Sequence, residues 1–109
     1  MKEVRLKFAG ELPKLILEGK KDTTWRINDE KNIEEGDVLI LISTESLKEF
    51  GKANVIKVNN TTFKNLNYND KEGHEKFITE EEMYETYSKY YNTKIIPETK
   101  VKVITFKLL

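Results

Sequence analysis

The side chains best suited to catalysis lie in one short segment, residues 19–26, with the sequence GKKDTTWR. Amide hydrolysis requires a nucleophile, a group that accepts the nucleophile's proton, and stabilisation of the oxyanion. In this segment Thr24 offers a hydroxyl oxygen, Lys21 an amine and Arg26 a guanidinium. The segment therefore combines the residue types needed for a hydrolytic or anion-binding site.

Lys21 can accept a proton near neutral pH only if its pKa falls from about 10.4 towards 7. Such a shift of about 3 units corresponds to roughly 4 kcal/mol of differential interaction between the charged and neutral amine. Burial of the amine and the nearby Arg26 cation both lower the pKa. Both effects favour Lys21 as a base for the Thr24 hydroxyl.

The residues before this segment predict a short helix, which ends in a turn that leads into a strand. Apolar residues at helical spacing over 12–16, with Pro13 in the first turn, predict a short helix that ends near Gly19. Glycine at that place suits a left-handed C-terminal cap. Lys21 then follows the turn and can fold back over the strand.

β-Branched and aromatic residues predict a strand over 23–27. Because strand side chains alternate, Thr24 and Arg26 share one face, and Trp25 and Ile27 share the other. We expect the second pair to lie in the core and the first pair to point into a cleft or solvent. In the purely structural interpretation, Arg26 forms an ion pair with Asp29 or Glu30.

The rest of the chain predicts an α+β fold. Alternating or continuous apolar residues predict further strands over 4–8, 38–42, 51–58 and 101–106, and a turn at 34–37. A helix is predicted over 79–91, with Thr79 and Glu82 as a capping box. The tyrosines of that helix are expected to pack in the core rather than to form a stacking platform. The pattern predicts a partly closed β-barrel of five to six strands flanked by two helices.

Composition narrows the class of protein. A chain of 109 residues fits one domain, which we expect over 1–109. The 19 basic residues balance the 19 acidic ones, so nucleic-acid binding would depend on a local patch. There is no cysteine and only one histidine, and we expect neither a metal site nor a cofactor. The charged N-terminus and the lack of a long apolar run predict a cytoplasmic protein without membrane partners.

The pattern G-x-K-x-x-T-x-R of residues 19–26 resembles the signature of the ASCH domain, a small family related to the PUA RNA-binding fold. Further segments resemble ASCH landmarks in order and spacing, namely Gly36-Asp37, the stretch 50–53, the stretch 73–77, the helix ending in Tyr90-Tyr91, and the last strand. The resemblance covers nearly the whole chain. It implies a PUA-like barrel with a positively lined cleft beside residues 19–26.

The resemblance also implies two functions. Proposed roles in the family are RNA binding and, in small single-domain members, hydrolysis of the acetyl amide of N4-acetylcytidine. Carried over by position, the catalytic residues are Lys21, Thr24 and Glu75, with Glu72 as an alternative to Glu75. The other residues expected to contact substrate are Gly19, Lys20, Arg26, His74 and Glu72.

Two arrangements of these groups remain open. Lys21 can serve as the base for Thr24, with Glu75 holding the lysine or binding the polar edge of the substrate. Alternatively, Glu75 activates a water molecule and Lys21 stabilises the oxyanion. The competing function is RNA binding, in which Lys14, Lys20, Lys21 and Arg26 contact phosphates and Trp25 stacks on a base if it is exposed.

Overall fold

The computed structural model describes residues 1–109. The elements in chain order are β1 (Glu3–Phe8), α1 (Leu12–Leu17), β2 (Thr23–Arg26), β3 (Val38–Ser43), β4 (Glu49–Thr62), the 3-10 helix η1 (Phe63–Asn65), α2 (Tyr68–Lys71), α3 (Glu80–Tyr91) and β5 (Lys100–Leu108). All five strands and both helices predicted from the sequence are present. The short helices η1 and α2 are present in addition to the two predicted flanking helices.

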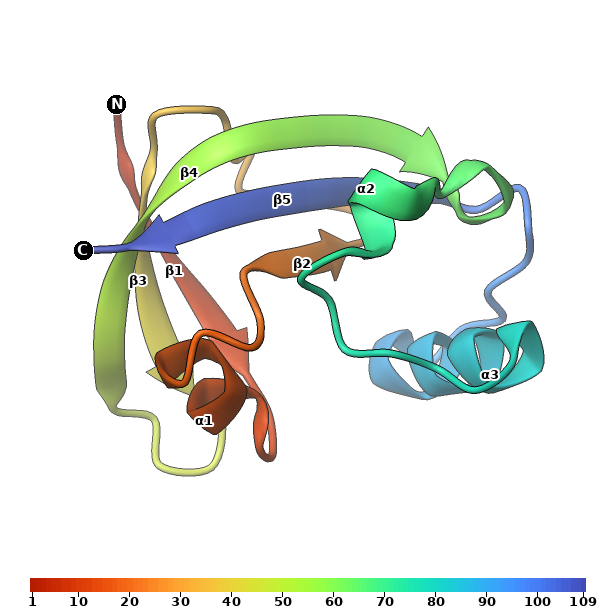
Figure 1. Ribbon diagram of the computed structural model, residues 1–109, viewed down its shortest axis with the longest axis horizontal. Helices are drawn as coiled ribbons and strands as arrows, with labels where there is room; N and C mark the ends of the chain where they lie inside the picture. Colours follow the sequence, from red (N-terminus) through yellow and green to blue (C-terminus); the bar gives the residue numbers. More distant parts are fainter.

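The five strands form one sheet in the order β1-β3-β4-β5-β2. β1 runs parallel to β3, and the other neighbours are antiparallel. The long strands β4 and β5 cross the molecule together, and the sheet curls so that its edge strands β1 and β2 approach each other without pairing (Figure 1). This arrangement is the predicted partly closed barrel, and its opening lies between β1 and β2.

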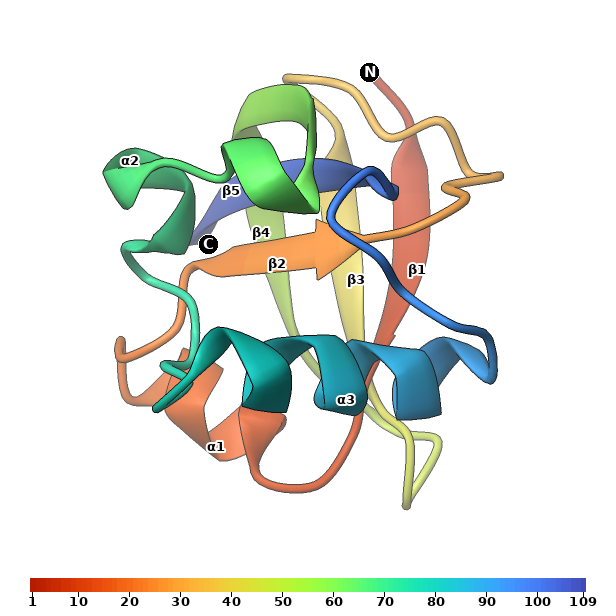
Figure 2. The same cartoon turned by 90° about the vertical axis from the view of Figure 1, so that its right-hand side faces the viewer.

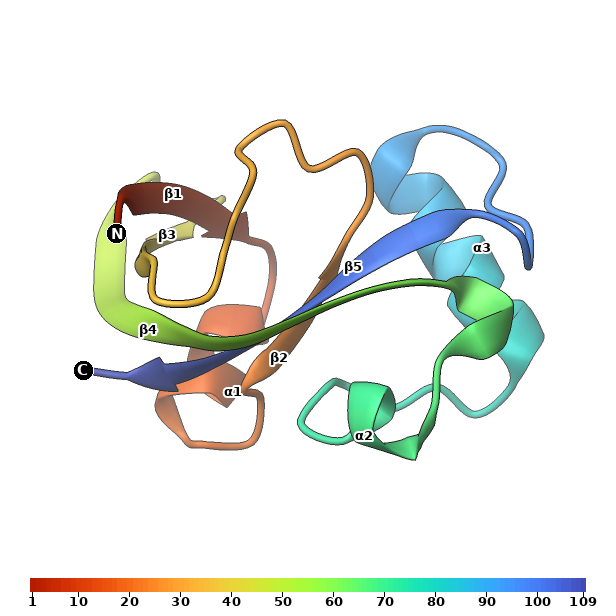
Figure 3. The ribbon, with the colours of Figure 1, turned by 90° about the horizontal axis from the view of Figure 1, so that it is seen from above.

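The two faces of β5 serve two separate hydrophobic clusters. Ile104 and Phe106 face the barrel interior, where they pack with residues of β1, β3 and β4. Val101 and Val103 face the other way and pack with Trp25 of β2 and with side chains of α3. Figure 2 shows α3 crossing the front of the molecule below β2. Seen from above, β1 and β3 lie at one end of the molecule and α3 at the other (Figure 3).

The helix ends follow local sequence rules. α1 is followed by Gly19 with φ +77°, as the predicted left-handed cap requires. Thr79 caps the N-terminus of α3, and its hydroxyl accepts a hydrogen bond from the Glu82 backbone N–H. The reciprocal half of the predicted capping box is absent. None of the helices has the length and apolar character needed to cross a membrane.

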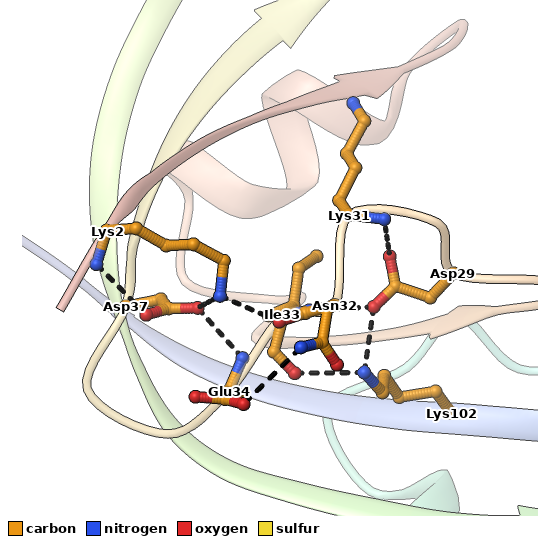
Figure 4. Close-up of polar contacts among 8 residues, drawn as sticks. All are labelled: Lys2, Asp29, Lys31, Asn32, Ile33, Glu34, Asp37 and Lys102. Atoms are coloured by element: carbon orange, nitrogen blue, oxygen red, sulfur yellow. Dashed lines mark hydrogen bonds and ion pairs between the residues drawn. The ribbon is translucent and has the colours of Figure 1, made fainter.

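Two aspartates attach the loop between β2 and β3 to the sheet (Figure 4). The Asp37 carboxylate accepts hydrogen bonds from the Lys2 ammonium at 2.7 Å and from the Glu34 backbone N–H at 2.9 Å. The Asp29 carboxylate accepts from the Lys102 ammonium at 2.8 Å and from the Ile33 backbone N–H at 2.9 Å. These contacts hold the loop against β1 and β5.

Candidate functional site

Backbone hydrogen bonds bring the two segments of the candidate site together. The carbonyl oxygen of Gly73 accepts from the N–H groups of Asp22 and Thr23, at 2.9 and 3.1 Å. Gly73 has φ +77°, and a Cβ atom built there would lie 1.8 Å from Oδ1 of Asp22. Only glycine allows this close approach, which places the chain after Gly73 beside the turn before β2.

Lys21 and Glu75 form an ion pair at this junction. The Lys21 Nζ donates to Oε1 of Glu75 at 2.6 Å and to the carbonyl oxygen of Thr23 at 2.6 Å. The lysine side chain is 1 % exposed and the glutamate side chain 21 % exposed, so the carboxylate is the group that meets solvent. Two protein acceptors, the Glu75 carboxylate and the Thr23 carbonyl oxygen, therefore fix the position of the ammonium.

Burial and charge act on both partners. Burial lowers the pKa of Lys21 below its ordinary value, although the Glu75 carboxylate opposes this shift. Burial acts to raise the pKa of Glu75, but the neighbouring His74 and Lys21 outweigh it, and the pKa lies below its ordinary value. Glu75 is therefore ionised near neutral pH.

Thr24 and Arg26 lie on the same face of β2, as the strand alternation predicts. The Arg26 Nε donates to the Thr24 hydroxyl oxygen at 3.2 Å, and its Nη2 donates to the carbonyl oxygen of Lys7 at 2.9 Å. The guanidinium carbon also lies 4.8 Å above the centre of the Phe8 ring. Arg26 therefore spans the opening between the edge strands β2 and β1.

The ion pair of Arg26 with Asp29 or Glu30, which the purely structural interpretation required, does not form. Asp29 pairs with Lys102 of β5 instead, and the Asp29 side chain also fixes the loop through Ile33. Arg26 turns towards the barrel opening because its face of β2 points there.

A pocket of about 230 Å³ lies at this opening, between the end of β1, the start of α1, β2 and α3. It is lined by Lys7, Phe8, Ala9, Leu12, Lys21, Thr24, Trp25, Arg26, Thr44, Glu75, Tyr87, Tyr90 and Tyr91. Most of the tyrosines pack as expected: Tyr87 is buried, and Tyr84 and Tyr91 are partly buried against the same cluster. Tyr90 is the exception, because it is 57 % exposed beside the pocket. The pocket lining thus combines polar groups with aromatic rings.

His74 lies behind Glu75, outside this lining. Its ring is buried and stacks on the Trp25 indole, with centroids 3.8 Å apart and planes inclined by 15°. Nε2 lies 2.8 Å from the Tyr87 hydroxyl, and Nδ1 lies 2.8 Å from the Glu75 carbonyl oxygen. Burial, aided by the charge of Lys21, lowers the pKa of His74 to about 3. His74 is neutral and does not reach the pocket, so the expectation that it contacts substrate is not supported.

Three other predicted site residues lie outside the pocket. Lys20 is exposed, with its ammonium 3.5 Å from Glu18. Glu72 is exposed at the end of α2, and Gly19 only shapes the turn after α1.

Two of the basic residues considered for phosphate contacts are not free cations. Lys21 is buried against Glu75, and Arg26 is engaged across the barrel opening. Trp25 is buried and donates from its indole N–H to the carbonyl oxygen of Asp70, so its ring faces the core as expected. No group of three or more histidine, aspartate or glutamate side chains is arranged to hold a metal ion.

Sequence reasoning did not identify the aromatic residues that line the pocket. Phe8 alternates with charged residues in β1 and was expected only as a core residue, and Tyr90 and Tyr91 end an otherwise ordinary amphipathic helix. The signal available was the spacing of Tyr87, Tyr90 and Tyr91, which places all three rings on one side of α3.

Comparisons with known proteins test the predicted family resemblance. No protein-family sequence model matches the chain, and no curated protein sequence is significantly similar to it. Similar solved structures do exist. An ASCH domain from Lactobacillus crispatus JV V101 matches with a TM-score of 0.73 and 12% identity, over 98% of this chain and 79% of that one.

Two further structures agree with this result. An ASCH protein from Zymomonas mobilis matches with a TM-score of 0.68 and 16% identity, over 96% of this chain and 66% of that one. A hypothetical protein, PH0355, matches with a TM-score of 0.74 and 26% identity, and the match covers 100% of both chains. The protein therefore has the fold of the ASCH domain, a PUA-like partly closed barrel, over nearly its entire length.

Proposed function

We propose that the pocket binds a single acylated nucleobase or nucleoside and hydrolyses its amide bond. The observation that carries this proposal is the Lys21–Glu75 ion pair in the lining of a pocket that also contains aromatic rings. Withdrawing an ammonium from water is costly, and apolar side chains of similar size often give equal or greater stability. Buried ionisable groups with shifted pKa values in a cleft are typical of functional sites.

The size and lining of the pocket suit a small planar substrate. A volume of about 230 Å³ lies below the roughly 300–1,000 Å³ of pockets for drug-sized ligands, so one base fits better than an oligonucleotide. Tyr90, which is 57 % exposed, offers a ring surface for stacking. Thr24 accepts a hydrogen bond from Arg26, which leaves its own hydroxyl hydrogen free to donate to the substrate.

Of the two catalytic arrangements, the contacts favour Glu75 as the base. Glu75 is ionised and partly exposed, whereas Lys21 donates to two acceptors and makes no hydrogen bond with the Thr24 hydroxyl. In this scheme Glu75 takes a proton from water while the water oxygen bonds to the acyl carbon. The Lys21 ammonium stabilises the resulting oxyanion.

Collapse of the intermediate completes the reaction. The carbon–nitrogen bond breaks, and the departing amine receives the proton held by Glu75. The products are a carboxylic acid and a base with a free amino group. Water supplies both the added oxygen and the hydrogen, so no other reactant is needed.

The test is turnover of N4-acetylcytidine and other acylated cytidines by the purified protein, with products separated by chromatography. Lys21→Met and Glu75→Gln should each lower kcat by about 100-fold or more, the usual scale for losing a positioned base or oxyanion partner. Each has a matched control on the same segment, Lys20→Met and Glu72→Gln, because those side chains are exposed outside the pocket. Circular dichroism verifies folding of all four variants.

The outcome separates the two functions. If the wild type releases no acyl group from any of these compounds, the proposal of hydrolysis fails, and RNA binding without catalysis becomes the preferred function. If Glu72→Gln is inactive while Glu75→Gln is active, the assignment of the base is wrong.

A further inference from the structure

His74 is buried, chemically versatile and not used in the scheme above. Three elements meet at its ring. Trp25 of β2 stacks on one face, Tyr87 of α3 contacts Nε2, and Glu75 of the following loop contacts Nδ1. A buried imidazole with partners at both nitrogens is fixed in place and in tautomer.

The partners determine which nitrogen carries the proton. Nδ1 faces two acceptors, the Glu75 carbonyl oxygen at 2.8 Å and the Glu75 carboxylate oxygen Oε1 at 3.0 Å. A neutral imidazole has one N–H, and it must point at these acceptors. Nε2 is then the acceptor, and the Tyr87 hydroxyl donates to it at 2.8 Å.

The two contacts to the carboxylate fall on the same oxygen. Lys21 Nζ lies 2.6 Å from Oε1 of Glu75, and His74 Nδ1 lies 3.0 Å from the same atom. The other oxygen, Oε2, has no hydrogen bond to the protein and belongs to a side chain that lines the pocket. Fixing Oε1 therefore orients Oε2 for contact with water.

We propose that His74 is a positioning residue for Glu75: its Nδ1–H holds Oε1, and the Tyr87 hydroxyl fixes the tautomer that supplies this N–H. The chain of contacts runs from Tyr87 on α3 through His74 to Glu75 and Lys21. This proposal rests on the proposed hydrolysis for its kinetic consequence, but not for its structural one.

The structural consequence is testable without activity, because His74 is the only histidine of the chain. In ¹⁵N NMR of histidine-labelled protein, we expect one protonated Nδ1 and one unprotonated Nε2, unchanged between pH 5 and 8. The titratable groups facing the ring are Lys21, Glu75, Lys76 and Tyr87. An Nε2–H tautomer, or titration near the ordinary histidine pKa, would overturn the proposal even if the enzyme is active.

The kinetic consequence uses His74→Phe, which keeps a ring against Trp25 but removes the donor. Loss of an N–H near the carboxylate raises the pKa of Glu75, so the acidic limb of the kcat/KM profile should move to higher pH. We expect kcat to fall about tenfold and KM to change less than twofold. The other titratable and charged groups around Glu75 are Lys21, Arg26, Tyr87 and Tyr90.

Two tyrosine variants test the same proposal if His74→Phe fails to fold. Tyr87→Phe keeps the ring and removes only the hydroxyl, so it should change the Nε2 resonance and lower kcat. Tyr84→Phe is the matched control one turn earlier on α3, since the Tyr84 hydroxyl makes no hydrogen bond. Unchanged pH profiles in both His74→Phe and Tyr87→Phe would overturn the positioning role. If the wild type is inactive but the NMR result holds, the proposed function fails and the tautomer assignment stands.

Discussion

At the scale of single residues, Lys21 is the side chain whose environment differs most from that of an ordinary surface lysine. It is buried at the junction of two segments, and its nitrogen donates to both a carboxylate and a carbonyl oxygen. The two catalytic arrangements require opposite protonation states of this amine. The pH dependence of turnover therefore distinguishes them.

We expect activity to be lost as pH rises through the Lys21 pKa, which burial places below 10.5. The sign follows from the role of Lys21: an amine that stabilises an oxyanion must be protonated, and it loses its proton at high pH. A base would give the opposite result, because it works only after losing the proton. Steady-state kcat measured from neutral to alkaline pH, with circular dichroism at each pH, decides between them. A rise through this limb would contradict the assignment of Glu75 as the base.

At the scale of elements, the site depends on how the loop after α2 docks on the turn before β2. Gly73 makes this contact through its carbonyl oxygen, and its backbone has φ +77°. The loop after β2 is attached in a different way, through the carboxylates of Asp29 and Asp37. The first junction positions the Lys21–Glu75 pair, and the second holds the loop between β2 and β3 against the sheet.

Gly73→Ala should damage both stability and activity. The left-handed backbone costs about 1 kcal/mol for a residue with a Cβ atom, and the new methyl group would overlap the Asp22 carboxylate. The Asp22 side chain, the loop or both must then shift, and we expect the loop to move Glu75 relative to Lys21. Urea unfolding and turnover measure the two effects. Gly36→Ala is the matched control, because Gly36 has φ +90° but open space around it. Equal loss of activity in both variants would contradict this account.

Asp37→Asn should reduce stability at neutral pH but not in strong acid. The hydrogen bond from Lys2 holds the pKa of Asp37 at about 2, below its ordinary value of 3.8. A pKa lowered by folding stabilises the protein above pH 3.8, and the contribution is lost as pH falls towards 2. Because the Lys2 side chain is 43 % exposed, solvent screening keeps this contribution small. Urea unfolding of both proteins at pH 7 and pH 2 tests this, and a difference independent of pH would contradict it.

At the scale of the whole molecule, the even balance of charge gives no strong overall field that would attract a polyanion. The chain has 19 basic and 19 acidic residues. Of the basic residues between 20 and 26, Lys20 lies on the surface near Glu18. Lys21 and Arg26 already donate hydrogen bonds to Glu75 and to the Lys7 carbonyl oxygen. A partner with many phosphates would find few free cations near the site.

We therefore expect RNA binding to be weak and only slightly dependent on salt. A cluster of three free cations would give a log–log slope of roughly two to three, at about 0.7 to 0.9 per phosphate contacted. Because Lys21 and Arg26 already donate hydrogen bonds within the protein, we expect a slope of about one or less. Fluorescence anisotropy of short RNAs across a salt series measures it. A slope near three would show phosphate contacts elsewhere on the protein and would favour the binding module.

The sequence by itself determined the strands, the short helix before Gly19 and the faces of β2. Alternation and cap residues are local signals, so the expectation that Thr24 and Arg26 share one face while Trp25 and Ile27 are buried is confirmed. The same reasoning missed α2 and η1, which together span only 7 residues. Elements this short carry almost no periodic pattern.

Tertiary structure alone decided which side chains meet. Glu75 rather than Glu72 contacts Lys21, across a separation of 54 residues, because Gly73 docks on the turn before β2. Arg26 contacts the carbonyl oxygen of Lys7 because curling of the sheet brings its two unpaired edge strands together. Spacing along a chain describes one element at a time, whereas these contacts depend on how separate elements pack.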